Sequence, residues 1–254
     1  MIDINCHILP GLDEGSKSIT ESIAMARTAE KEGIKTIIAT PNHHKDSSWN
    51  DPMEIMGAVK FMNEKMKEEG IDVEVLPGQE TRVYGEMSDD LKAGKILPIN
   101  GSKYICVELP SNQVPEYTTQ LFFEIQILGH IPVIVHPEKN HEFRENPDKL
   151  YRIVKNGALT QLSAASLAGK LGRNTERFAN QILDANLAHF VASNARNNKK
   201  QGFFMKEAFA RVKKNYGKDF ANLLIDNSDA LVHDEAIFKD VPDRIAVKKK
   251  WGMF

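Results

Sequence analysis

The sequence predicts a single-domain α/β protein built as a distorted, seven-stranded (β/α) barrel. Apolar, strand-like runs alternate with helical patterns about seven times along the chain, and this order favours a parallel sheet with right-handed crossovers. The length of 254 residues matches the usual size of one such barrel. No GxGxxG or GxxxxGK(S/T) motif follows a strand-like run, so an open, nucleotide-binding sheet is not supported.

Three apolar runs in the first third of the chain end in polar residues, as expected of strands that enter a barrel mouth. They span residues 2–7, 36–44 and 73–80. Between them, residues 18–33 follow helical spacing and stop at a glycine, and residues 52–70 form a second helix. We assign the apolar face of this second helix to core packing. That face carries Met53, Met56, Val59, Met62 and Met66.

The rest of the chain repeats the same alternation. Four further strands are expected at 104–110, 131–138, 158–162 and 188–197. Four further helices are expected at 115–129, 147–157, 175–186 and 203–216. We therefore divide the chain into a barrel, residues 1–243, and a basic-aromatic C-terminal tail, residues 244–254. The end of this tail, 248–254, is interpreted either as a frayed terminus or as a contact with a membrane surface or a partner.

The composition favours a cytoplasmic protein that does not bind nucleic acid. The net charge of −2 gives no general attraction to nucleic acids or membranes. The two cysteines, Cys6 and Cys106, lie inside apolar runs, as buried and reduced thiols of cytosolic proteins do. The sequence shows no signal-peptide apolar region, and no apolar run reaches the ~18 residues that span a bilayer.

Polar residues at the carboxyl ends of the strands are the candidates for a functional site, because barrels place their reacting groups there. Glu80, Glu108 and His136 come from three separate strands. Two carboxylates that meet at one mouth repel each other unless a cation lies between them, and carboxylate with imidazole suits Mn, Fe or Zn. The other strand-end residues are Asn5, His7, Asn42, His43, Asn194 and Arg196.

These motifs resemble the PHP-fold (polymerase and histidinol phosphatase) proteins. They are most similar to the bacterial protein-tyrosine phosphatases of the CpsB/CapC/YwqE group, encoded in capsule and exopolysaccharide operons. The matching pieces are IDINCHILPGLDEG (2–15), ATPNH (39–43), LPGQE (76–80), HPEKN (136–140), SLAG (166–169) and VASNARN (191–197). The resemblance implies a PHP-type α/β barrel with a cluster of metal ions, commonly manganese. It also implies a partner: the phosphotyrosine-containing tail of a bacterial tyrosine kinase.

Carried over to this sequence, the family's three metal positions differ in how well they are kept. The position formed by Glu80, Glu108 and His136 is intact. A second position draws on Asn5, His7, Glu80 and Asn194, so half of its ligands are neutral amides. A third draws on Glu14 (or Asp13), Asn42 and Arg196, and an arginine cannot ligate a metal. The resemblance therefore implies manganese or another divalent transition metal, in fewer than three ions and in the extreme case none.

The family's two phosphate-facing arginines are also replaced. The resemblance places them at Lys139 and Gln201, so with Arg196 these are degenerate catalytic positions. We expect Arg196 to turn into the mouth and to pair with Glu80 or Glu108 in place of a cation.

Three interpretations of function follow, and whether this chain is an enzyme stays open among them. The first is a working or weakly working metal-dependent tyrosine phosphatase. The second is a pseudophosphatase, which keeps the fold and binds a kinase tail or another protein without catalysis. The third is a site altered on purpose to trap substrate, which Arg196 and Gln201 fit less well. A homo-oligomer is compatible with all three.

Overall fold

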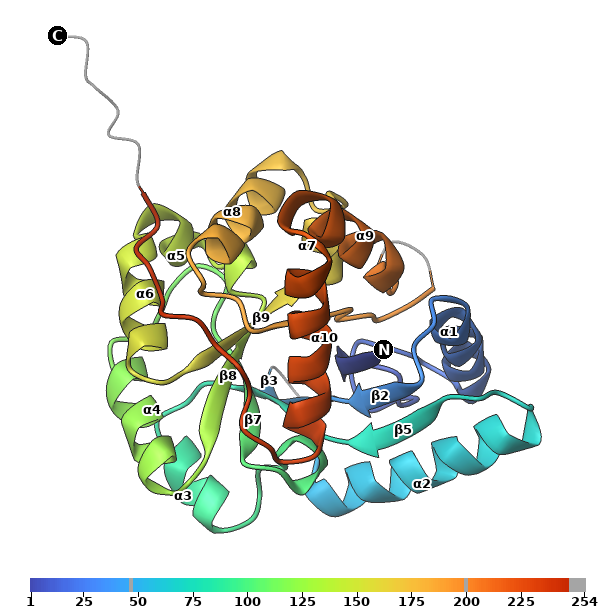
Figure 1. Cartoon of the computed structure of the whole chain (residues 1–254). Helices are drawn as coiled ribbons and strands as arrows, with labels where there is room; N and C mark the ends of the chain where they lie inside the picture. The colour runs from blue at the N-terminus through green and yellow to red at the C-terminus, as the bar shows by residue number, and fades with distance from the viewer. Residues whose placement is uncertain (46–47, 199–200, 247–254) are drawn as a thin grey trace, which may run out of the picture.

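The wall of the predicted barrel is made of seven parallel stretches of β-strand, here called staves (Figure 1). A stave is either one strand or two consecutive strands that follow the same line. The computed structural model describes residues 1–45, 48–198 and 201–246. Five staves are the single strands β1 (Ile2–Cys6), β7 (Tyr104–Glu108), β8 (Ile131–Val135), β9 (Leu159–Ser163) and β10 (Phe190–Ala192). Two staves are split into β2 (Thr36–Ala39) with β3 (Asn42–Lys45), and β5 (Glu74–Pro77) with β6 (Glu80–Arg82).

The two split staves correct the prediction of single strands at 36–44 and 73–80. Pro41 has no backbone N–H to give to a neighbouring strand, so the first stave breaks there. In the second stave, a Cβ at Gly78 would lie 2.7 Å from Cγ2 of Ile38, so only glycine permits this approach. Pairing resumes where Glu80 N–H donates to the Pro41 carbonyl at 3.1 Å. The upper strands β3 and β6 thereby pair with each other nearer the mouth and join the seven-stranded sheet through β7, whereas β1, β2 and β5 form a second sheet.

Hydrogen bonds between β1 and the chain that follows β10 close the barrel. The Asn194 N–H donates to the Asn5 carbonyl, and the His7 N–H donates to the Ala195 carbonyl, both at 2.9 Å. Below them, the buried Asp3 carboxylate accepts the Ser193 N–H at 2.8 Å and also the Ser193 hydroxyl. Asp3 therefore ties the first stave to the last.

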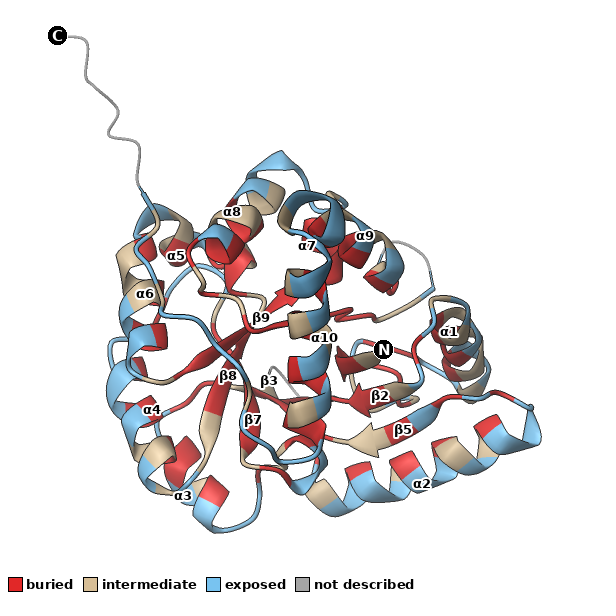
Figure 2. Ribbon diagram, viewed as in Figure 1, coloured by how far each residue is buried: buried red, intermediate tan, exposed pale blue. Residues whose placement is uncertain are grey.

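Six predicted helices cover the outside of the barrel, with buried residues on their inward faces and exposed ones outside (Figure 2). They are α1 (Ile19–Lys31), α2 (Pro52–Glu68), α4 (Thr118–Ile127), α6 (Pro147–Lys155), α8 (Arg173–Asp184) and α9 (Met205–Tyr216). Side-chain caps from Ser18 and Asp51 fix where α1 and α2 begin.

The prediction that a methionine face of α2 packs in the core is wrong at the N-terminal end of the helix. Met62 and Met66 are buried as expected, but Met53 is 74% exposed and Met56 is 49% exposed. Ile55 takes the buried place instead. The N-terminal end of α2 thus leaves large apolar side chains in solvent.

Four helices were not predicted: α3 (Met87–Lys92), α5 (His141–Glu145), α7 (Ala164–Leu167) and α10 (Lys218–Val232). The first, second and third are too short to show helical periodicity. In α10 the inward face includes the polar residues Asn227 and Ser228, which dilute the apolar pattern. Asn227 is held there by hydrogen bonds to the carbonyls of His189 and Phe238.

After α10 the chain runs as an extended strap back towards α6 (Figure 1). Arg244 pairs with Asp148 on α6 and lies 4.5 Å from the centre of the Tyr151 ring. The first residues of the predicted tail are therefore docked on the barrel, while 248–254 lies outside the described residues. The division at 243/244 stays a prediction.

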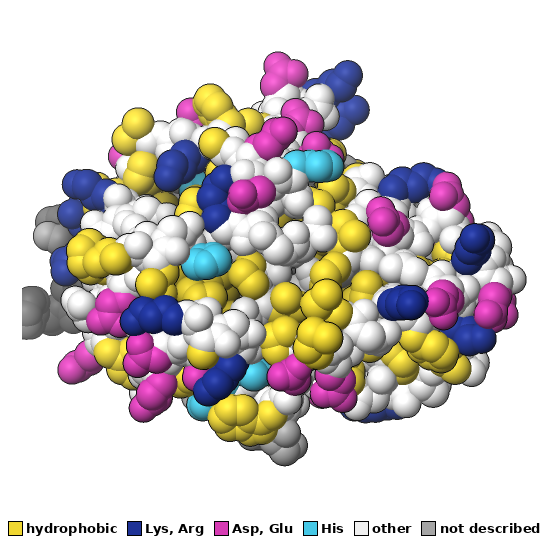
Figure 3. All heavy atoms as spheres, turned by 90° about the horizontal axis from the view of Figure 1, so that it is seen from below, with side chains coloured by type: hydrophobic (Ala, Val, Ile, Leu, Met, Phe, Trp, Pro, Cys, Tyr) yellow, Lys and Arg dark blue, Asp and Glu magenta, His cyan; other side chains and the backbone are white. Residues whose placement is uncertain are grey.

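The described surface carries both signs of charge. Figure 3 shows acidic and basic side chains interspersed around a hydrophobic centre on the face seen from below. Among the described helices, none is long and apolar enough to cross a membrane.

Asp3 makes the stability of the barrel depend on pH. Burial raises its pKa to about 6, although the hydrogen bonds from Ser193 and Asn5 act in the opposite direction. Because this pKa exceeds that of an unfolded aspartate, the folded state keeps a proton that the unfolded state has lost between about pH 4 and 6. The contribution of Asp3 to stability is therefore present in full below about pH 4 and is lost as the pH rises through about 6.

Asp3→Asn should remove this pH dependence, because the amide carries no titrating proton and its oxygen still accepts the Ser193 N–H. Denaturant titrations should show the wild type losing about 3 kcal/mol relative to the variant between pH 4 and pH 7. The exposed Asp240 serves as the control through Asp240→Asn. A difference between wild type and Asp3→Asn that stays constant with pH would contradict this account.

Candidate metal centre at the barrel mouth

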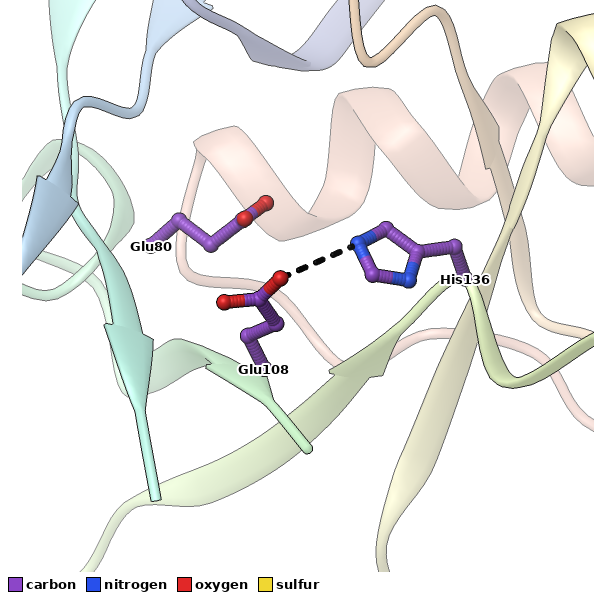
Figure 4. Close-up of side chains that lie close together, drawn as sticks. All are labelled: Glu80, Glu108 and His136. Atoms are coloured by element: carbon purple, nitrogen blue, oxygen red, sulfur yellow. Dashed lines mark ion pairs between the residues drawn. The ribbon is translucent and has the colours of Figure 1, made fainter. Parts of the chain in front are cut away.

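Glu80, Glu108 and His136 converge at the barrel mouth (Figure 4). Glu80 is the first residue of β6, Glu108 is the last residue of β7, and His136 directly follows β8. One ligand atom from each lies within 4.8 Å of the others. Nε2 of His136 is 3.9 Å from Oε1 of Glu108, and both glutamates are buried. The position predicted to be intact is therefore assembled, and its donor set fits one divalent ion.

His136 reaches this position through an uncommon backbone conformation. Its φ of 40° is left-handed, and its N–H donates to the Gln161 carbonyl at 2.7 Å before the short helix Pro137–Lys139 begins. Asn194 and His44, also near the mouth, have φ values of 51° and 54°. Left-handed backbone is costly for side chains other than glycine and gathers at functional sites.

Amide groups surround the Glu80 carboxylate on the side where the second metal position was predicted. Nδ2 of Asn5 donates to Oε2 of Glu80 at 2.7 Å, and Nδ2 of Asn194 lies 3.4 Å from the same oxygen. Oδ1 of Asn5 accepts from Asn194 at 3.2 Å and from the Thr40 hydroxyl at 3.1 Å. The two asparagines thus present N–H donors to Glu80 on the side where the second metal position was predicted.

His7 is oriented by Asp13. The Asp13 carboxylate contacts Nδ1 of His7 at 2.6 Å and accepts the N–H groups of Asn42 and Gly15 at 2.9 and 2.8 Å. Burial alone raises the Asp13 pKa, but these hydrogen bonds and the His7 charge outweigh it and hold the pKa well below its usual range. Nε2 of His7 consequently faces Glu80, 4.0 Å from Oε2.

The contact with His7 distinguishes Asp13 from Glu14 by position. Asp13 is the inward carboxylate, whereas the Glu14 side chain is 45% exposed. A glycine two residues later makes the turn possible, since a Cβ at Gly15 would lie 2.3 Å from the His7 carbonyl oxygen. Of the two alternatives, Asp13 lies closer to His7, and the assignment of Asp13 or Glu14 as a metal ligand stays a prediction.

Arg196 turns into the mouth, as predicted, with its side chain 12% exposed. It pairs with Glu14, a partner that was not predicted, and its Nη2 lies 4.0 Å from Oε1 of Glu80. Burial lowers the pKa of the guanidinium and the charge of Asp13 raises it, and the group stays charged.

Glu108 forms an ion pair with Arg82, a residue that the sequence analysis did not include in the site. Nε of Arg82 lies 2.9 Å from Oε2 of Glu108, and the two residues are register partners in β6 and β7. The spacing in the sequence was the available signal: Arg82 lies two residues after Glu80 in β6, and side chains two residues apart on a strand point to the same side.

The remaining predicted residues divide into those at the mouth and those outside it. Asn42 is the register partner of Glu80, and its buried amide atoms have no hydrogen-bond partner among the described residues. Nζ of Lys139 donates to Oδ1 of Asn194 at 3.2 Å. Gln201 is exposed and bonds to Asn197, so it is not brought into the mouth.

A family model for capsular polysaccharide synthesis, CpsB/CapC, matches residues 1–233. The chain belongs to the CpsB/CapC family. It is 43% identical to the tyrosine-protein phosphatase YwqE of Bacillus subtilis over 254 residues, with all of both chains covered. It is 27% identical over 245 residues to the tyrosine-protein phosphatase CpsB of Streptococcus pneumoniae, covering 93% of this chain and 100% of that one.

Solved structures agree with this membership. YwqE, described together with CpsB as a unique metal-dependent tyrosine phosphatase, superposes with a TM-score of 0.96, covering 97% of this chain and 100% of that one. An organophosphorus hydrolase superposes with a TM-score of 0.54 at 10% identity over 91% of this chain and 92% of that chain, and shares the fold alone.

Charge at the mouth of this CpsB/CapC chain is nearly balanced by its own side chains. Four carboxylates (Asp13, Glu14, Glu80 and Glu108) lie among three cationic side chains (Arg82, Arg196 and Lys139). The donor set of Glu80, Glu108 and His136 suits a divalent ion. The asparagine and arginine positions around Glu80 do not, because they present N–H donors.

Arg196→Ala should destabilise the chelator-treated protein, because the buried Glu80 loses a nearby positive charge. We expect the free energy of unfolding to fall by about 2 kcal/mol in urea titrations. Arg27→Ala is the control, since Arg27 forms an exposed pair with Glu69 and should change stability by less than about 1 kcal/mol. Equal effects of the two substitutions would show that Arg196 does not compensate Glu80.

Proposed function

We propose that this chain recognises phosphotyrosine in proteins at the barrel mouth and that its phosphatase activity is impaired. Tyrosine-protein phosphatases that match it over their full length support the substrate class. The observation that carries the impairment is the hydrogen-bonding of Glu80. Amide N–H groups contact its carboxylate and a guanidinium lies 4.0 Å away, where the family pattern requires metal ligands.

The residues that would hold a single divalent metal, manganese or another transition ion, are Glu80, Glu108 and His136. When bound, such an ion supplies an activated water and positive charge next to the phosphoryl oxygens. The protein contributes the orientation of the ligands. Arg82 holds the Glu108 carboxylate through its 2.9 Å contact, and the left-handed backbone at His136 directs the imidazole inward.

Two groups of this chain's own would act on the phosphoryl group. Lys139 and Arg196 are basic side chains at the mouth, and each lies beside the Glu80–Asn194 cluster. Lys139 offers a point charge where the family pattern has a planar guanidinium that grips two oxygens. Loss of metal ligands and of two phosphate-facing arginines removes transition-state stabilisation, and each ~1.4 kcal/mol lost is a tenfold loss in rate.

A binding protein without catalysis is the second candidate. The network of Asn5, Asn194 and Thr40 is made of hydrogen bonds within the chain and needs no ion to hold its geometry. The same fold and mouth would then bind a phosphorylated segment without cleaving it. In either case we infer that the partner is the phosphotyrosine-bearing tail of a bacterial tyrosine kinase, met in the cytoplasm.

Manganese should bind at no more than one ion per chain. After chelation and reloading, elemental mass spectrometry should give a ratio of one or below, and Glu108→Gln should lower it further by removing a ligand. Glu116→Gln, at an exposed glutamate, is the matched control. Two or more tightly held ions per chain would overturn the assignment.

Restoring the family pattern should restore activity. The combined variant Asn5→His, Asn42→His, Asn194→Asp and Arg196→His should bind more manganese and hydrolyse p-nitrophenyl phosphate at least ~100-fold faster than the unmodified chain. Single reversions should do little, because the ligands act as a unit. Adding Glu108→Gln to the combined variant should abolish the gain. If the unmodified chain already matches the combined variant, catalysis is not impaired.

A further inference from the structure

A short hairpin holds the Trp49 side chain at the rim of the mouth. The strand β4 (Ser48–Trp49) pairs antiparallel with β3, where His43 lies opposite Trp49. The next residue fixes the hairpin: Nδ2 of Asn50 donates to the Asn42 carbonyl at 2.6 Å and to the Leu12 carbonyl at 3.0 Å. The indole is therefore placed with respect to both β3 and the loop that follows β1.

Two further aromatic rings support the indole. Its ring centre lies 4.5 Å from that of His44, edge-on at 63°, and His44 stacks on Tyr84 at 3.8 Å and 4°. Tyr84 is buried and its hydroxyl donates to Asp90 at 2.7 Å. Trp49 itself is 62% exposed. A large aromatic side chain that is fixed by its neighbours but left in solvent loses little conformational entropy when a ligand covers it.

A cavity of about 630 Å³ joins the indole to the functional residues. Its lining includes Ser48, Trp49 and Asn50 from the hairpin and Asp13, Glu14 and Lys17 from the loop that follows β1. Asp13 is the residue that orients His7, and Glu14 is the partner of Arg196. The cavity thus lies between the exposed ring and the two carboxylate residues that contact His7 and Arg196, and its volume is that of a small-ligand site.

We propose that Trp49 is a specificity-determining residue, which receives the aromatic ring of a phosphorylated tyrosine whose phosphoryl group lies at the mouth. This assignment rests on the proposed function. An aryl ring packs on an indole in offset or edge-to-face geometry, and such contacts add to the burial of apolar area. A phosphorylated serine has no ring to place there. Trp49 would therefore favour aryl over alkyl phosphoryl ligands.

Binding to two non-hydrolysable peptides tests this role. One carries phosphonomethyl-phenylalanine and the other the phosphonate analogue of phosphoserine, in the same flanking sequence, and affinities are measured by calorimetry with the full chain. Trp49→Ala should weaken the aryl phosphonate about tenfold and leave the alkyl phosphonate unchanged. Trp49→Phe should recover most of the loss. Phe123→Ala is the control, because Phe123 is 57% exposed and does not line the cavity.

Fluorescence supplies an independent readout. The chain contains two tryptophans, so Trp251→Phe leaves Trp49 as the sole indole. The aryl phosphonate should shift the Trp49 emission to shorter wavelength as it covers the ring, and the alkyl phosphonate should not.

The outcomes separate this inference from the proposed function. Tight binding of the aryl phosphonate that Trp49→Ala leaves unchanged would overturn the role of Trp49 and leave phosphotyrosine recognition standing. Equal weakening of both phosphonates would show a structural rather than a selective role. Failure of the wild type to bind either phosphonate would overturn the proposed function, and the role of Trp49 with it.

Discussion

Burial of the Glu80 carboxylate is the constraint on which the mouth of this barrel depends. The residue is fully shielded from solvent, and a buried negative charge is strongly destabilising unless other groups compensate it. Here the compensation includes donors of the chain itself, namely the amides of Asn5 and Asn194 and, at 4.0 Å, the guanidinium of Arg196.

The same constraint explains why charged side chains of both signs lie together at the mouth. An arginine near Glu80 without a carboxylate of its own would leave an excess of positive charge, and Glu14 supplies that carboxylate. Glu108, one strand further, has Arg82 as its own partner. Each carboxylate of the intact ligand set is thus held by a neighbour, which keeps the Glu80, Glu108 and His136 geometry within 4.8 Å.

Much of the fold could be predicted from sequence because the staves are short, apolar and punctuated by polar ends. The break at Gly78 could not, because it depends on a close approach between neighbouring strands. The break at Pro41 had a local signal, the missing N–H of proline, which the prediction did not use. The convergence of Glu80, Glu108 and His136 followed from their strand-end positions. The contact of Arg196 with Glu80 was predicted and is confirmed at 4.0 Å, but its pairing with Glu14 was not, since that contact depends on the turn that Gly15 permits.

The split staves have a consequence for how such a site changes over evolutionary time. The lower strands β1, β2 and β5 form one ladder, whereas β3 and β6 belong to another that carries Asn42 and Glu80. A substitution in the upper ladder leaves the lower pairing intact, so the scaffold tolerates drift at the mouth. A side chain such as Asn42 can therefore change without altering the pairing of β1 with β2 and β5, whereas Asn5 lies within that pairing.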